Sequence, residues 1–109
     1  MKPIPKTLLI HSAKLLEVTE GAWQEKNEKE IAALKNVRIE PSGKMIITND
    51  NRSITLSAVL FYDCRNSSPK TEIKCGNYIV FEGQRYRVET VERLYDRARL
   101  HHLEVGLCL

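Results

Sequence analysis

The chemistry open to this chain centres on two adjacent histidines, His101 and His102. An imidazole can bind a metal ion or carry a proton near neutral pH. Adjacent side chains on a strand point to opposite faces of a sheet, so we do not expect these two rings to chelate one metal together. A further ligand would have to come from Asp63, Glu104 or His11, whose spacing does not support a metal site. We therefore predict that one histidine pairs across strands at a sheet end and that the other is solvated.

Asp63 is the second candidate for chemistry, because it ends an apolar run at residues 59–62. It lacks a partner in the sequence for acid–base catalysis. The residues that follow it, Asn66-Ser67-Ser68-Pro69, are small and polar and cannot continue a central strand. We predict that the Asp63 carboxylate accepts hydrogen bonds from the backbone N–H groups of residues 65–67 and so holds a structural turn.

The three cysteines, Cys64, Cys75 and Cys108, are an odd number and contain no C-x-x-C pair. This pattern argues against a disulfide framework and against a zinc site, and it favours thiols that act as small apolar side chains. The chain also lacks a glycine-rich phosphate loop and a nucleophile elbow. We therefore predict no catalytic residue, no metal site and no cofactor, in a protein that is not an enzyme.

Length and composition are typical of one small globular domain that spans residues 1–109. The net charge is +3, and Arg85, Arg87 and Arg93 lie among glutamates. This mixture predicts a solvated face of mixed charge, because nucleic-acid binders usually carry a clustered basic stripe. No apolar run approaches the length of about 20 residues that spans a membrane. The first residues lack the apolar core of a signal peptide, so we expect an intracellular protein with no membrane partner.

The C-terminal third predicts a β-meander, since short runs of aromatic and β-branched residues meet at glycine-containing corners. Two of these runs lie within residues 76–88 and are joined by Glu82-Gly83-Gln84. In the strand at residues 85–95, a bulge at Glu89-Thr90 would bring Val91 back into register. The last strand should place four side chains on one face: Leu103, Val105, Leu107 and Leu109.

The middle of the chain predicts further strands. Residues 31–40 should form one, with core residues Leu34, Val37 and Ile39. The odd-numbered step from Leu34 to Val37 implies a bulge near Lys35-Asn36. A short run at residues 44–48 follows, between two turn signals. Residues 53–64 predict the longest strand, and it should be central because its second half is apolar on both faces.

The N-terminal segment, residues 3–19, fits a strand better than a helix, although part of its apolar spacing is also helical. Leu8, Ile10, Leu16 and Val18 would share one face and Leu9 and Leu15 the other, which implies a bulge or bend. Residues 20–30 predict a polar connecting loop with room for one helical turn. Trp23 in that loop either anchors another subunit, since tryptophan is over-represented at interface hot spots, or folds back over its own core.

These segments together predict a mainly β fold: a small β-barrel or sandwich of about six to seven antiparallel strands, with long polar loops and room for one short helix. A chain of this length buries only a small core, so a partner that covers more apolar surface would stabilise it. With no visible catalytic centre, its function would depend on its surface and on assembly.

Four segments, taken in their order along the chain, carry a resemblance to a known family. They are LKNVRIEP at residues 34–41, VLFYDCRNS at 59–67, GNYIVFEGQRYRV at 76–88 and HHLEV at 101–105. Over roughly residues 7–107, the chain resembles the minor capsid proteins of tailed phages and prophages of Gram-positive bacteria. That group is similar to the head–tail joining proteins of phages, the stoppers and connectors.

This resemblance implies a structural role in virion assembly. Family members form a ring in the neck, between the portal-side adaptor protein and the tail-completion or tail-terminator protein. The resemblance therefore implies that the chain binds copies of itself and that DNA meets it only as cargo of the channel. The implied locations are the host cytoplasm during assembly and the virion neck in the mature particle.

The resemblance further implies that a loop between early strands lines or closes the neck channel. Residues 41–52 fit this role by position, and residues 20–30 are the rival. The channel-loop candidates are Ser42, Gly43, Asn49, Asp50, Asn51 and Arg52. The candidates for contacts with neighbouring subunits are Trp23, Arg85, Arg87 and Arg93.

A nucleic-acid-binding β-barrel of the oligonucleotide-binding type is the alternative function. Such a fold would carry aromatic rings on an exposed sheet face beside lysines or arginines. The candidate rings are Tyr78, Tyr86 and Tyr95. Tyr86 alternates with Arg85 and Arg87 along its strand instead of sharing their face, which weakens this alternative. A small enzyme is a third and less favoured class.

Overall fold

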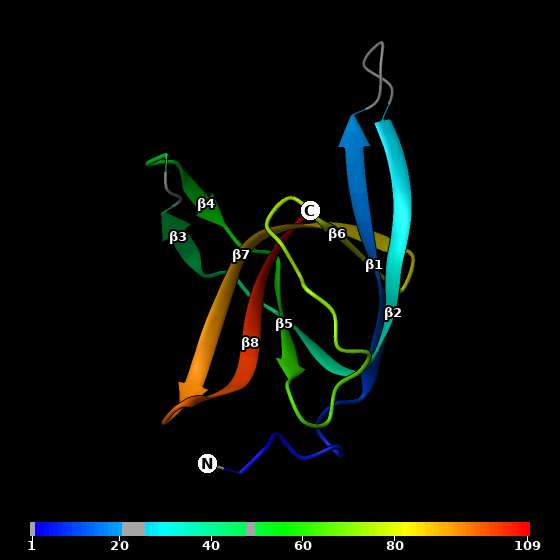
Figure 1. The fold of residues 1–109 in the computed structure, drawn as a ribbon. Helices are drawn as coiled ribbons and strands as arrows, with labels where there is room; N and C mark the ends of the chain where they lie inside the picture. Colours follow the sequence, from blue (N-terminus) through cyan, green and yellow to red (C-terminus); the bar gives the residue numbers. More distant parts are fainter. Residues whose placement is uncertain (1, 21–25, 48–49) are drawn as a thin grey trace.

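The computed structural model of the protein describes residues 2–20, 26–47 and 50–109. Within these residues the regular secondary structure consists of eight strands and no helix, which confirms the predicted mainly β fold. Six strands close into an antiparallel barrel in the order β1-β2-β5-β8-β7-β6, and β3 and β4 form a separate two-stranded sheet (Figure 1). The strands are β1 His11–Glu20, β2 Lys26–Pro41, β3 Met45–Ile47, β4 Ser53–Thr55, β5 Ala58–Asp63, β6 Tyr78–Phe81, β7 Gln84–Asp96 and β8 Arg99–Cys108.

The single long strand predicted at residues 53–64 is wrong, because the structure has two strands there. β4 pairs with β3 outside the barrel, whereas β5 pairs with β2 and β8 inside it. At the break, Leu56 is buried and its N–H donates to the carbonyl oxygen of Lys44 at 2.8 Å. The N–H of Ser57 then donates to the carbonyl oxygen of Leu107 at 2.8 Å, which returns the chain to the barrel. The longest strand is instead β2, with 16 residues.

The polar loop and helical turn predicted at residues 20–30 are also wrong where the structure describes these residues. β1 continues to Glu20 and β2 begins at Lys26, so the two strands form one long hairpin. Cross-strand pairing with β1 overrides the helix-forming tendency of residues 26–30. Trp23 lies outside the described residues, so neither of its two predicted roles is tested.

The N-terminal strand is shorter than predicted, because β1 begins at His11. Before it the chain turns, and the N–H of Leu8 donates to the carbonyl oxygen of Pro5 at 2.9 Å. This turn changes the predicted faces, since Leu9 is buried whereas Ile10 is 65% exposed. Inside β1, Leu15 is fully buried, and two register shifts against β2 confirm the predicted irregularity of this segment.

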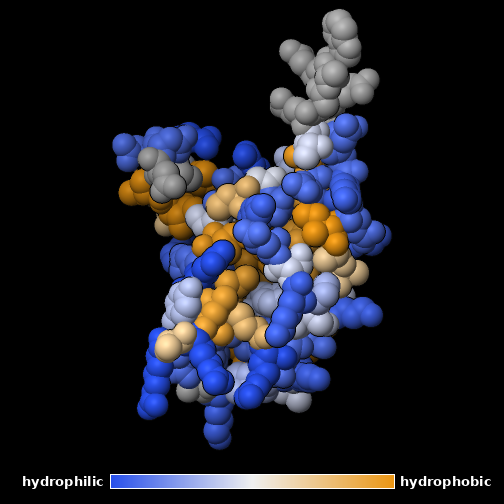
Figure 2. All heavy atoms as spheres, in the orientation of Figure 1, coloured by the Kyte–Doolittle hydropathy of each residue, from blue (hydrophilic) through white to orange (hydrophobic). Residues whose placement is uncertain are grey.

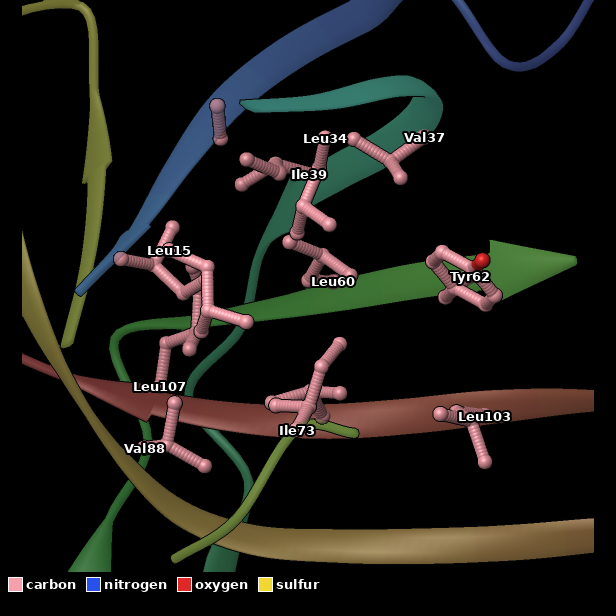
Figure 3. Packing of buried hydrophobic residues seen from close by; sticks show 14 residues of the cluster. Leu15, Leu34, Val37, Ile39, Leu60, Tyr62, Ile73, Val88, Leu103 and Leu107 are labelled. Atoms are coloured by element: carbon pink, nitrogen blue, oxygen red, sulfur yellow. The ribbon is translucent and has the colours of Figure 1, made fainter. Parts of the chain in front are cut away.

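The core lies inside the barrel and receives side chains from every barrel strand. Figure 3 shows Leu15, Leu60 and Leu107 directed toward one another from β1, β5 and β8. The predicted core residues are buried: Leu34, Val37, Ile39, Leu103, Val105 and Leu107. The prediction that Leu109 shares the inward face of Leu103, Val105 and Leu107 is wrong. β8 ends one residue earlier, and the Leu109 side chain is 73% exposed.

Two bulges keep apolar residues directed into the barrel, as predicted from odd-numbered steps in the sequence. In β2, the pairing with β1 shifts between Leu34 and Val37, and Asn36 adopts a φ of 56°. In β7, the pairing with β8 shifts between Val88 and Thr90. An extra residue at each shift restores the inward direction of the next apolar side chain, which a regular strand would turn outward.

Two hairpins project from one end of the barrel. In Figure 1 the β1–β2 hairpin and the β3–β4 hairpin extend toward the same end, on different sides of it. The N-terminus and the β7–β8 turn lie at the opposite end, together with the loop that follows β5. The molecule therefore has a projecting end and a closed end that carries turns and the N-terminal segment.

Gly106 allows the chain to pack closely where β4 gives way to β5. It is buried in β8, and a Cβ atom there would meet the side-chain oxygen of Thr90 and lie 3.1 Å from two methyl carbons of Leu56. Leu56 enters the core at the break between β4 and β5. The absence of a side chain at position 106 is therefore needed for the strand break.

We predict that Gly106→Ala lowers the free energy of unfolding by about 1–3 kcal/mol, because the added methyl group overpacks a filled site. Urea denaturation followed by circular dichroism measures this change. Gly43→Ala is the matched control, since nothing lies within 4 Å of a Cβ atom at that glycine. Equal stability of the two variants would contradict the packing role of Gly106.

Candidate assembly surfaces and the Asp63 turn

Asp63 is a fully buried carboxylate at the end of β5, with 0% of its surface exposed. Its Oδ2 atom accepts the N–H of Arg65 at 3.0 Å and the N–H of Asn66 at 2.7 Å. Its Oδ1 atom accepts the N–H of Ile4 at 3.0 Å. Two of the three donors expected for this side chain are therefore present, and the N-terminal segment supplies a donor that the sequence did not indicate.

Ser67 extends this hydrogen-bond network to the bulge in β2. Its N–H donates to the backbone oxygen of Asp63 at 2.9 Å, not to the carboxylate. Its hydroxyl accepts the Asp63 N–H at 2.9 Å and donates to the carbonyl oxygen of Asn36, the bulge residue. The Asn66 side-chain amide donates to the carbonyl oxygen of Ile4 at 2.7 Å. The network thus joins the N-terminal segment, the turn after β5 and β2.

The two groups beside Asp63 stay protonated over a wider pH range than usual. Burial raises the pKa of the Tyr62 hydroxyl, and the nearby Cys64 and Asp63 raise it further. That hydroxyl donates to the carbonyl oxygen of Pro69 at 2.6 Å. Burial also raises the pKa of the Cys64 thiol, as does Asp63, while Lys70 lowers it. A thiol held in its protonated form is a poor nucleophile, so this cluster has the character of a structural anchor.

The two histidines contact each other, so the prediction that they point apart is wrong. Their Nδ1 atoms lie 2.7 Å apart, and both rings are half-buried. The Nε2 atom of His101 lies 2.6 Å from the carbonyl oxygen of Lys2, and that of His102 lies 3.1 Å from a Glu104 carboxylate oxygen. His11 instead accepts the backbone N–H of Ile39 at 3.0 Å. The described residues contain no group of three or more metal-ligating side chains.

The arginines predicted to contact other subunits differ in their surroundings. Arg85 forms an ion pair with Glu28 of β2, and its guanidinium carbon lies 4.2 Å from the ring centroid of Tyr78. The Nε atom of Arg87 lies 3.8 Å from the Oε1 atom of Glu89. Arg93 is exposed and lines a hollow at the closed end of the barrel. Tyr78 and Arg85, which are both candidates for contacts with nucleic acid, therefore contact each other, and Arg85 also pairs with Glu28.

The segment that contains the channel-loop candidates is a hairpin and not an open loop. The N–H of Ser42 donates to the carbonyl oxygen of Ser57 at 3.1 Å at its base. Near its tip, Asn51 has a φ of 61° and Arg52 lies 2.8 Å from Asp50. Gly43 follows Ser42 and is exposed, with no atom within 4 Å of the position that a Cβ atom would take. Asn49 lies outside the described residues.

Exposed apolar side chains on this hairpin are the surface feature that the sequence did not single out. Met45 is 66% exposed and Ile47 is 75% exposed on one face of β3. On the other face Ile46 pairs with Ile54, and both are half-buried. Figure 2 shows hydrophobic residues gathered on this projection. All three residues of β3 are apolar, so the sequence does not tell which face lacks a neighbour.

The described part of the chain forms a small closed β-barrel with two projecting hairpins and a hydrogen-bonded anchor. None of the described residues forms a helix with the length and apolar character that crossing a membrane requires. The arrangement defines a small β-barrel module with exposed apolar side chains on its projecting β3–β4 hairpin.

This chain belongs to the minor capsid protein family, because the family's sequence model matches residues 5–107. It is therefore a phage structural protein. No curated protein and no solved structure matches the chain.

We predict that Asp63→Ala lowers the free energy of unfolding by about 2 kcal/mol, since it leaves buried N–H groups without an acceptor. Thermal melts beside the parent protein measure this loss. Asp50→Ala is the control, because Asp50 is an exposed carboxylate near the tip of the β3–β4 hairpin. An unchanged melting temperature for Asp63→Ala would show that the carboxylate does not hold the turn, and would redirect attention to chemistry around Asp63 and the histidines.

The raised pKa of Cys64 predicts a loss of stability in alkaline solution. Above the ordinary thiol pKa of 9.0 the unfolded chain releases this proton while the folded chain retains it, so the free energy of unfolding falls as pH rises. The fall between about pH 8 and about pH 10 should be smaller in Cys64→Ala than in the parent. Cys75→Ala, which removes an exposed thiol, should leave the fall unchanged. Urea denaturation at each pH measures the free energy of unfolding. An equal fall with pH in Cys64→Ala and Cys75→Ala would refute the attribution of this fall to Cys64.

Proposed function

We propose that this phage structural protein is a head–tail connector of the stopper type, which forms a ring and joins the DNA-filled head to the tail. The observation that carries the proposal is the pair of exposed apolar side chains, Met45 and Ile47, on the β3–β4 hairpin. A sheet of two three-residue strands is marginally stable in water by itself. Contacts with other proteins would both bury these side chains and stabilise the hairpin.

The geometry of the hairpin favours a ring. The barrel itself is closed, and closure leaves no continuous free edge around it for pairing with another chain. A projecting hairpin that docks on a different surface of the next copy makes a heterologous contact, and such contacts generate a ring when the rotation closes. The described surface lacks a long apolar stripe of the kind that obligate dimers use, so the isolated chain would be a monomer or weak oligomer that assembles on its docking partner.

In this proposal the neighbours are the portal-side adaptor protein on the head side and the tail-completion or tail-terminator protein on the other. DNA passes as cargo, and the protein performs no catalysis. The chain is made in the host cytoplasm and takes its place in the virion neck. The β3–β4 hairpin, with Asp50, Asn51 and Arg52 near its tip, is the proposed channel-lining element, and the β1–β2 hairpin at the same end is the rival.

We predict that replacing Met45 and Ile47 together by serine leaves the melting temperature within a few degrees of the parent value, because both side chains are exposed. The variant should nevertheless be missing from particles made by a phage that lacks its own copy of this gene. Immunoblots of purified particles, with infectivity as a second readout, measure the effect.

A double replacement of Ile10 and Leu109 by serine is the matched control, since these side chains are equally exposed but lie outside the hairpin. We expect the control protein to be incorporated normally. Normal incorporation of the hairpin variant, with full infectivity, would rule out the hairpin as the assembly contact.

A further inference from the structure

The closed end of the barrel carries a cluster of cations around three adjoining hollows. Their volumes are about 550, 390 and 270 Å³, and Lys70 lines all three. The largest is also lined by Arg65 and Arg99, and the second by Arg93. All four side chains are exposed. We call these four residues, Arg65, Lys70, Arg93 and Arg99, the basic mouth.

The carboxylates around the basic mouth do not balance its charge. Asp63 lines the largest hollow, but it is fully buried and its oxygens accept three backbone N–H groups. Asp96 lines the same hollow, and Glu72 lines the second and lies 3.9 Å from Lys74. Arg97, in the β7–β8 turn, adds a further exposed cation at this end.

Charge is distributed unevenly between the two ends of the molecule. The β1–β2 hairpin projects from the opposite end, and its strands include four glutamates and two lysines within residues 17–20 and 26–30. Figure 2 shows hydrophilic side chains gathered over the closed end, away from the hydrophobic β3–β4 hairpin. A polyanion would therefore be attracted to the closed end and repelled by the β1–β2 hairpin, because potentials of several kT arise from such distributions.

The composition of the basic mouth points to phosphate. Three of its four cations are arginines, whose planar guanidinium groups match the oxygens of a phosphate in a bidentate geometry. The cations are spread around three hollows that share Lys70 instead of converging on one point, an arrangement that can meet a row of phosphates. Two described residues that line the hollows carry rings, Tyr62 and His101. Tyr62 is buried and its hydroxyl donates to Pro69, and both ring nitrogens of His101 contact other groups of the chain, so neither ring is presented as a platform for a nucleic-acid base.

We propose that the basic mouth binds the sugar–phosphate backbone of duplex DNA without reading its sequence. This inference rests on the proposed function, in which DNA passes the protein as cargo. Binding through four exposed cations is weak and salt-sensitive, because most of its free energy comes from the release of counterions. Such a contact holds passing DNA loosely at the closed end of the protein.

The test is fluorescence anisotropy with a short labelled duplex of mixed sequence over a series of sodium chloride concentrations. The parent should bind with a dissociation constant of about 10⁻⁴ to 10⁻⁶ M near physiological salt, and log K should fall against log salt with a slope of about −4. Arg65→Gln, Lys70→Gln and Arg99→Gln together should weaken binding at least about tenfold and bring the slope to about −1.

The matched control is Lys14→Gln, Lys29→Gln and Lys44→Gln together, which removes the same net charge from exposed positions away from the mouth. It should bind DNA within about twofold of the parent if the contact is local. A variant in which Arg65 and Arg99 become lysine keeps the charge and should retain most of the binding. If the glutamine variant proves unstable in a melt, Arg93→Gln alone provides the same comparison on the other side of Lys70.

Three results would overturn the proposal: equal binding by the mouth variant and the parent, equal losses in the mouth and control variants, or equal competition by poly-glutamate of matched charge. The last result would identify a docking site for an acidic protein. The outcome is separable from the proposed function, which is judged by incorporation into particles. If the mouth variant enters particles and binds DNA as the parent does, this inference alone is refuted. If the protein binds DNA through the mouth but is absent from particles, the connector role alone is refuted.

Discussion

The buried carboxylate of Asp63 is the interaction on which the closed end of the barrel depends. A carboxylate taken out of water is costly unless hydrogen bonds replace its hydration, and here three backbone N–H groups do so. Because the donors come from the N-terminal segment and from the turn after β5, one side chain fixes both. Ser67 links the same network to the β2 bulge at Asn36, so strand pairing and turn geometry are set together. Arg65, whose backbone N–H donates to Asp63, borders the largest hollow of the basic mouth.

The sequence was sufficient for those parts of the fold that depend on local patterns. The odd-numbered step between Leu34 and Val37 predicted a bulge, and the Glu82-Gly83 corner predicted a tight hairpin turn, where both residues have positive φ. The break after Thr55 could not be predicted, because the alternation continues through it and the cause is space for Leu56 beside Gly106. The strand at residues 27–30 could not be predicted for another reason: its side chains are exposed on both faces, so no alternation of apolar side chains marks it.

The candidate surfaces were predictable only where one residue and its sequence neighbours decide the geometry. The hydrogen bonds from Arg65 and Asn66 to Asp63 are of this kind. The ion pair between Arg85 and Glu28 joins distant strands, so the sequence could not show that Arg85 has a partner. The rule that neighbours on a strand point apart failed for His101 and His102, because side-chain rotation brings their ring nitrogens together. Exposure of Met45 depends on which strands lie beside β3, which is a property of the whole fold.

The seam that closes the barrel has a consequence for how the chain folds. β1 meets β6 over only three residue pairs, Lys14 to Leu16 against Val80 to Tyr78, between segments far apart in the sequence. Hairpin pairs such as β6–β7 and β7–β8 form between neighbours in the sequence, whereas this seam requires closure of a long stretch of chain, so we expect it to form late. Until it forms, β1 and β6 each present an unpaired edge. Chains made at high concentration therefore pass through a stage in which the same edges can pair between molecules, and correct assembly requires that closure within each chain be faster than the encounter of two chains.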